Sequence, residues 1–172
     1  MFVLGHVGIG RVLVHRWRDR LPLVPLSVGT LLPDLIDKPL YYSRLWPYLT
    51  ATRTFGHTGL LLLALAGAGV LLESRVLKAL SAGVATHLLL DFVGDLPDGL
   101  MNSSTLIAAT WPLMGGRFST FYLPSMAAHA WLLLLSWPTV STELLGGLLL
   151  LREWRAGRAP AATRGADRLE QH

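Results

Sequence analysis

The chain has 172 residues, of which 52% are hydrophobic and 15% are charged, and its mean hydropathy is +0.46. Soluble domains carry about 25% charged residues, so this balance indicates one compact membrane domain and argues against an ordinary soluble enzyme. The sequence contains no cysteine, which excludes disulfides and thiolate metal ligands. The net charge of +4 comes from basic clusters beside oily segments, which typically mark cytoplasmic helix ends, so no nucleic-acid partner is expected.

Two short apolar segments occupy the first part of the chain. Residues 3–15 predict a helix that ends in a basic cluster at 16–20, and no cleavage site follows, so this helix is expected to be retained. Residues 23–33 are apolar again and are expected to stop at the sequence LLPDLIDKP. Residues 38–56 are then predicted to form a polar and aromatic loop.

The middle of the chain carries the clearest membrane signal. Residues 57–73 are a candidate spanning helix, and a tight basic turn leads into a second apolar run at 79–93. This hairpin has almost no polar face to present to water, which argues against a soluble helical bundle. Residues 94–123 are the longest predicted connection and contain a short apolar piece at 105–114.

The last apolar segment covers residues 124–151, and Pro138 is expected to kink or divide it, so one or two crossings are possible. The following residues are rich in Ala, Gly, Arg and Pro and are expected to be disordered and cytoplasmic. We therefore divide the chain into a transmembrane domain at 1–151 and a basic tail at 152–172. The predicted fold is all-α, a polytopic transmembrane bundle of about five helices. Several apolar runs are shorter than the ~20 residues that cross a bilayer, which suggests that their outer halves line a cavity.

The charges separate by side when the five segments alternate in direction. The basic clusters then share one side, which is the cytoplasm by the positive-inside rule. The opposite ends carry three imidazoles and three carboxylates, from His6, Asp34, Asp37, His57, His87 and Asp91. Ionisable groups at membrane depth cost roughly 2.5–3.5 kcal/mol each and usually mark function. The pattern predicts one shared polar site at the extracytoplasmic ends of the first four helices.

A divalent cation would explain this gathering, because it neutralises crowded carboxylates and accepts neutral imidazole nitrogens. Mixed nitrogen and oxygen donors suit zinc, with manganese or iron as alternatives, and six ligands suit one or two ions. His87 and Asp91 are four residues apart, so on a helix they share one face. Ordinary structural roles remain open for each residue alone: an Asp–His hydrogen bond, a helix cap at Asp34, Asp37 or His57, or a buried histidine.

Other polar residues receive lesser roles. His129 lies in the middle of the last apolar segment and is expected to pack or to support the ligands from behind. Asp95 and Asp98 are expected to support the site or to cap the loop that follows. His15 belongs to the interfacial basic region, and His172 ends the tail.

The order of His6, LLPDLID, RTFGHT and HLLLD resembles the YdjM-like family of membrane-bound metal-dependent hydrolases. The resemblance covers about residues 1–115 and implies metal ligation by the six residues named above. It also places Arg53 beside the metals, where the guanidinium would hold an anionic substrate. Thr52 stands where the family often has a histidine, and Gly56 where it has a threonine. The family is distantly similar to zinc-dependent phospholipases C and related nucleases, which favours phosphoester hydrolysis by analogy.

The predicted function is a membrane-embedded hydrolase that uses a metal-activated water on a phosphoester of a lipid or lipid-linked substrate. Arg53 would grip the phosphate, and Asp37 or Asp95 would accept the proton. The alternatives are a proton- or metal-coupled transporter and a structural membrane protein with a metal staple. The expected location is a bacterial-type inner or plasma membrane, with the site facing outward. The oligomeric state is left open.

Overall fold

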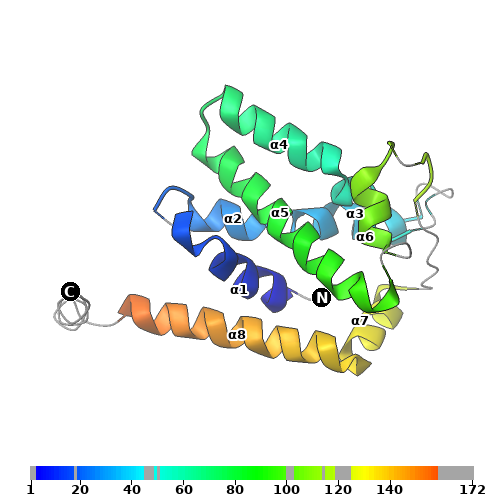
Figure 1. The fold of residues 1–172 in the computed structure, drawn as a ribbon. Helices are drawn as coiled ribbons and strands as arrows, with labels where there is room; N and C mark the ends of the chain where they lie inside the picture. Colours follow the sequence, from blue (N-terminus) through cyan, green and yellow to red (C-terminus); the bar gives the residue numbers. More distant parts are fainter. Residues whose placement is uncertain are drawn as a thin grey trace.

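The structure is a computed structural model that describes residues 3–17, 19–44, 49, 51–99, 103–113, 115–118 and 125–158. All the regular elements in these ranges are helical (Figure 1), which confirms the all-α prediction. The longer helices are α1 (Val3–Leu13), α2 (Leu23–Gly29), α3 (Leu32–Tyr42), α4 (Gly59–Leu71), α5 (Arg75–Asp95), α6 (Ser104–Thr110), α7 (Met126–Leu135) and α8 (Trp137–Arg158). Short 3₁₀ turns add η1 (His15–Trp17), η2 (Phe55–His57) and η3 (Leu96–Asp98).

The predicted end of the second apolar segment is wrong. The chain leaves the helical pattern at Thr30 and Leu31, and α3 then carries both aspartates of LLPDLIDKP inside a helix. Pro33 does not break this helix because it lies in the first turn, where a missing backbone N–H costs no hydrogen bond. Neither Asp34 nor Asp37 is therefore a helix cap, and the predicted loop at 38–56 begins only after Tyr42.

The last apolar segment is divided as Pro138 predicts. Helices α7 and α8 meet at an angle of 87°, and Pro138 occupies the first turn of α8. Helix α8 crosses the predicted domain boundary at 151 and runs on to Arg158. The first part of the tail expected to be disordered is thus helical, and residues 159–172 lie outside the described residues.

The structure supports only part of the predicted membrane bundle. Among the described residues, α5 is long and apolar enough to cross a membrane, and the bent pair of α7 and α8 supplies a second such span if it is counted as one. Helices α1 and α4 are apolar but have 11 and 13 residues. A bundle with five spans is therefore not confirmed.

Glycines allow the helices that position the site to pack closely. A Cβ atom on Gly83 of α5 would lie 2.3 Å from the carbonyl oxygen of Leu26 in α2. In the same way, a Cβ atom on Gly8 of α1 would lie 2.2 Å from the carbonyl oxygen of Gly146 in α8. Such backbone contacts between small residues are a common way to pack helices where apolar burial alone provides little attraction. They fix α5 against α2 and α1 against α8.

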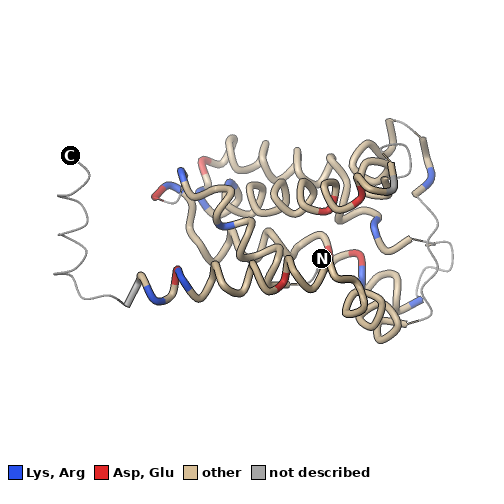
Figure 2. Tube along the Cα trace, turned by 60° about the horizontal axis from the view of Figure 1, so that its bottom comes forward, with Lys and Arg blue, Asp and Glu red and all other residues tan. Residues whose placement is uncertain are grey.

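The charges are arranged along the length of the bundle. Figure 2 shows a group of basic positions around the α4–α5 turn, η1 and the end of α8. The acidic positions of α3 and of the second half of α5 lie toward the other end. The separation that the sequence predicts is only partial, because Asp19, Glu73 and Glu153 lie among the basic residues and Lys38 and Arg53 lie beside the donor residues.

Candidate metal centre

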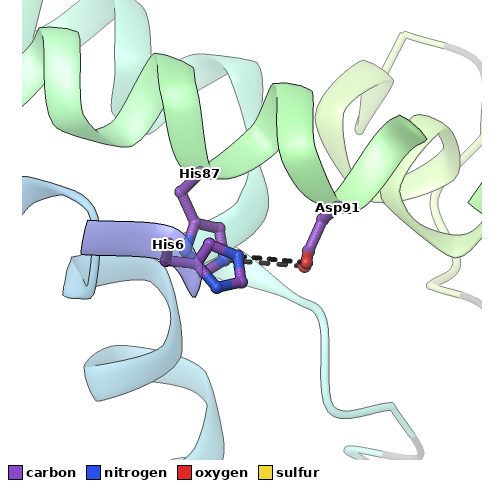
Figure 3. A group of neighbouring side chains, drawn as sticks. All are labelled: His6, His87 and Asp91. Atoms are coloured by element: carbon purple, nitrogen blue, oxygen red, sulfur yellow. Dashed lines mark hydrogen bonds and ion pairs between the residues drawn. The ribbon is translucent and has the colours of Figure 1, made fainter. Parts of the chain in front are cut away.

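Two helices bring three of the predicted ligands together. His6 of α1 and His87 and Asp91 of α5 point toward one another (Figure 3), and each is at most 5% exposed. His6 Nε2 lies 3.2 Å from Asp91 Oδ1, and the rings of His6 and His87 stack with their centroids 4.0 Å apart. The spacing of four residues on α5 places His87 Nε2 3.5 Å from Asp91 Oδ2, as the helical periodicity predicts.

His57 completes a triangle of donor atoms. This residue ends η2, is fully buried, and places its Nε2 3.1 Å from His87 Nε2 and 3.5 Å from Asp91 Oδ2. Around a tetrahedral zinc ion with Zn–N bonds of 2.0–2.1 Å, neighbouring donor atoms lie about 3.3 Å apart. The two imidazole nitrogens and the carboxylate oxygen therefore have the spacing of three ligands to a single ion.

Hydrogen bonds on the far side of each ring determine which nitrogen faces the centre. His87 Nδ1 lies 2.7 Å from the carbonyl oxygen of Thr30, which can only accept, so Nδ1 carries the proton. His57 Nδ1 donates in the same way to Asp37 Oδ2, at 2.7 Å. In neutral rings the two Nε2 atoms then present lone pairs to each other, and this contact needs a cation between them, either a proton or a metal ion.

Asp34 lies at the edge of this group. Its Oδ1 is 3.8 Å from His57 Nε2, and Asp34, His57 and His87 can each bring one donor atom within 4.8 Å of the others. The second oxygen of Asp34 forms an ion pair with Lys38, one helical turn away. Burial opposes ionisation of the carboxyl group, but Lys38 outweighs it and holds the pKa of Asp34 below its ordinary value.

Asp37 has a different place from the one predicted. Its Oδ1 accepts hydrogen bonds from Thr54 Oγ1 and Gly56 N, both at 2.8 Å. Its Oδ2 accepts from Thr54 N at 2.6 Å and from His57 Nδ1 at 2.7 Å. With both oxygens occupied in this way, Asp37 joins neither group of possible ligands. The structure makes it the residue that orients His57, where the sequence suggested a metal ligand or a proton acceptor.

Arg53 joins the site through Asp91. Its Nε lies 3.1 Å from Asp91 Oδ2, and its Nη1 lies 2.7 Å from Asp95 Oδ1 and 2.7 Å from Ser104 Oγ. Burial opposes the charged guanidinium, but Asp91 and Asp95 outweigh it and raise the pKa of Arg53 above its ordinary value. A positive charge is thus held next to the donor atoms, where the resemblance places it.

Asp95 supports this arginine and does not face the donors as a free base. Its Oδ2 also accepts from Thr105 N and Thr105 Oγ1, at 3.0 and 2.9 Å, and from Ser103 Oγ at 3.0 Å. These contacts tie the start of α6 to the end of α5. The supporting and capping role expected of Asp95 fits this geometry, whereas the role of proton acceptor does not.

The donor atoms form two overlapping groups, which are His6, His87 and Asp91, and Asp34, His57 and His87. The structure thus brings together five of the six predicted ligands, all except Asp37. His129 stands apart from them: its Nδ1 lies 2.8 Å from Tyr42 Oη, so it links α7 to α3. His15 lies in η1, next to Arg16. The side chain of Asp98 and the whole of His172 lie outside the described residues.

Sequence reasoning missed the groups that orient the two central histidines. The Thr30 contact uses a backbone carbonyl, which no side-chain pattern reveals. Thr54 lies inside the RTFGHT stretch and is fully buried, but its bonds to Asp37 depend on how the loop folds back on α3. The ion pair between Lys38 and Asp34 could have been predicted from the sequence, because the two residues have the helical spacing of four.

Comparisons with known proteins add no further evidence. No known protein-family profile, no curated protein and no solved structure matches the chain. The resemblance to the YdjM-like family therefore stays a prediction, carried by the motifs quoted above.

Proposed function

We propose that the chain is a membrane-embedded, metal-dependent hydrolase that acts on a phosphoester of a lipid or lipid-linked substrate. The observation that carries this proposal is the triangle formed by His57 Nε2, His87 Nε2 and Asp91 Oδ2, with sides of 3.1, 3.5 and 3.5 Å. The hydrogen bonds behind both rings direct their lone pairs into that triangle. Zinc is the cation we propose, in one or two copies, because it favours such nitrogen and oxygen donors.

The exposed surface supports a lipid environment. Helix α4 lies on the outside of the bundle (Figure 1), and Gly69 is its one buried residue. Large apolar side chains are open along and beyond it, with Leu63 68% exposed and Leu71 84% exposed. On α8, Leu148 is 64% exposed. Apolar surface of this extent calls for a cover, which a bilayer would supply. Helices α1 and α4, with 11 and 13 residues, are too short to span a bilayer alone.

Each residue around the donor atoms has a separate role in the proposed hydrolysis. A divalent cation held by His57, His87 and Asp91 would act as a Lewis acid and lower the pKa of a coordinated water. Arg53, anchored by Asp95, offers guanidinium donors to a phosphate oxygen. Asp34, whose Oδ1 lies 3.8 Å from His57 Nε2 and whose other oxygen pairs with Lys38, would supply a further donor at the edge of the triangle.

Metal content and hydrolysis of the purified full-length chain test this proposal together. Asp91→Asn removes the carboxylate that forms two of the three edges of the triangle. Ser81→Ala is the matched control, since Ser81 is a buried polar residue on the same helix. We expect one or two zinc ions per chain and release of phosphorylated headgroup from phospholipid vesicles. Both signals should be lost in Asp91→Asn and kept in Ser81→Ala.

Two results would contradict the proposal. A wild-type chain purified without metal, whose Asp91→Asn variant hydrolyses every tested phospholipid equally well, would remove the metal from the chemistry. A chain that binds zinc, hydrolyses none of the lipids and carries zinc into sealed vesicles would be a transporter.

A further inference from the structure

A second candidate site, which is lined by basic residues, lies far from the donor atoms. A pocket of about 410 Å³ is lined by Trp17, Arg20, Leu21, Arg75 and Lys78. Trp17 and its neighbours follow α1, whereas Arg75 and Lys78 belong to the first turn of α5. Since α5 rises about 1.5 Å per residue, its first residue is about 18 Å from His87 along the helix. The pocket thus belongs to the basic end of the bundle seen in Figure 2.

The basic residues of this pocket form no ion pair in the part of the chain that the structure describes, although Asp19 and Glu73 closely precede Arg20 and Arg75 in the sequence. No acidic residue lines the pocket, and no ion pair there joins Arg20, Arg75 or Lys78 to a carboxylate. Folding therefore brings cationic side chains from two distant segments together, and the carboxylates nearest to them in the sequence lie outside the pocket. An anion in the pocket would provide the missing charge.

Helix α5, which carries two of these cations, adds the positive end of its dipole to the positive charge of the pocket. Arg75 and Lys78 lie in the first turn of α5, which contains no acidic residue. The positive end of the helix dipole favours anions there and disfavours cations, so these side chains are placed against the usual preference. Ser74 caps the helix by accepting a hydrogen bond from Leu77 N at 3.3 Å, but its hydroxyl brings no charge.

We propose that this pocket binds the phosphate headgroup of an anionic phospholipid in the cytoplasmic leaflet. Trp17 is 52% exposed and suits the interface between headgroups and acyl chains. Leu71 and Leu72 end α4 just before the pocket and are 84% and 71% exposed, which puts apolar surface for the lipid tails next to the cations. The inference rests on the proposed membrane embedding but not on metal binding or hydrolysis.

Lipid binding to charge-matched variants tests the inference. The full-length chain in neutral detergent is titrated with phosphatidylglycerol, with phosphatidylcholine and with inorganic phosphate, and bound lipid is counted by native mass spectrometry. One variant combines Arg20→Gln, Arg75→Gln and Lys78→Gln. Its control combines Arg16→Gln, Arg152→Gln and Arg155→Gln, which removes the same charge from η1 and the last turns of α8, outside the pocket.

We expect the dissociation constant for phosphatidylglycerol to rise about fivefold for each pocket charge removed, and clearly less in the control. Phosphatidylcholine should bind weakly to all three proteins, and millimolar inorganic phosphate should not displace the anionic lipid. If the triple variant is unstable, Arg75→Gln alone should still show the fivefold effect.

Three outcomes would overturn the inference: equal losses in both triple variants, equal binding of phosphatidylcholine, or saturation of the pocket by inorganic phosphate alone. Zinc content measured on the same samples keeps this test separate from that of the proposed function. A chain without zinc that still binds phosphatidylglycerol through the pocket would refute the hydrolase and leave the lipid site standing.

Discussion

Asp37 and Asp91 are both buried aspartates near two histidines, yet their surroundings give them different tasks. Asp91 has oxygens 3.2 Å from His6 and 3.5 Å from both His57 and His87. Asp37 instead receives two backbone N–H groups, a hydroxyl and a ring N–H. The sequence marks both as ligand candidates because a carboxylate serves either task equally well. Only the position of the Thr54 loop, set by the tertiary fold, separates them.

An Asp37→Asn variant should therefore weaken metal binding without abolishing it. The amide keeps the size of the side chain but holds the His57 ring less firmly, and loss of such an orienting partner typically costs 10–100-fold in metal affinity. Zinc affinity is measured by competition with a chromophoric chelator, beside Asp91→Asn, for which we expect no tight binding. If Asp37→Asn loses zinc as completely as Asp91→Asn, then Asp37 is a ligand after all.

Among the helices, α8 supports the site by holding α1, although it is the last helix in the sequence. Glu143 of α8 accepts hydrogen bonds from Leu4 N and Gly5 N of α1, both at 2.9 Å. A carboxylate at this end of α1 satisfies unpaired amides and matches the helix dipole. Together with the Gly8–Gly146 contact, it fixes the helix that carries His6. The sequence predicts a site built by four helices, and the structure shows that a later helix holds the first of them in place.

Glu143→Ala should lower the free energy of unfolding by about 1–2 kcal/mol, since it leaves the start of α1 without its cap. Glu153→Ala is the control, because Glu153 pairs with Arg11 at 3.0 Å with both side chains partly exposed, and such pairs contribute at most about 1 kcal/mol. Thermal unfolding of both variants in one detergent gives the comparison. Equal destabilisation by the two substitutions would show that the cap on α1 contributes no more to stability than the ion pair of Glu153 does.

Prediction of the helices succeeds where an apolar run is continuous and at Pro138, but it fails at the prolines of the LLPDLIDKP stretch. The runs at 57–73 and 79–93 correspond to α4 and α5. Helix α3 is missed because Pro33 and Pro39 suggest a break, although a proline in the first turn is compatible with a helix and Pro39 is accommodated within it. Helix length is harder to predict than helix position, since packing and not composition decides where the last turn frays.

For the molecule as a whole, the separation of charges predicts how the chain is oriented in a membrane. The basic end contains η1 and the pocket at the start of α5, whereas the donor atoms lie toward the other end. By the positive-inside rule we expect the basic end to face the cytoplasm. The absence of cysteine makes this simple to examine, because each introduced thiol is the only one in the chain.

Arg16→Cys and Arg117→Cys are suitable probes, since both positions are exposed. In intact cells, a membrane-impermeant maleimide should label Arg117→Cys, whereas Arg16→Cys should react only after the membrane is opened. A reversed pattern would put the donor atoms in the cytoplasm. Labelling of both probes in intact cells would contradict a single orientation.

The bond from His87 to Thr30 also limits how many ions the centre can hold at full strength. With Nδ1 committed to the carbonyl, this ring has a single electron pair to give, yet both overlapping donor sets include it. Asp91 can serve two ions through its two oxygens, but the imidazole cannot. If the centre binds two ions, the first would have the complete set of donors, and the second would have fewer donors and would dissociate more readily.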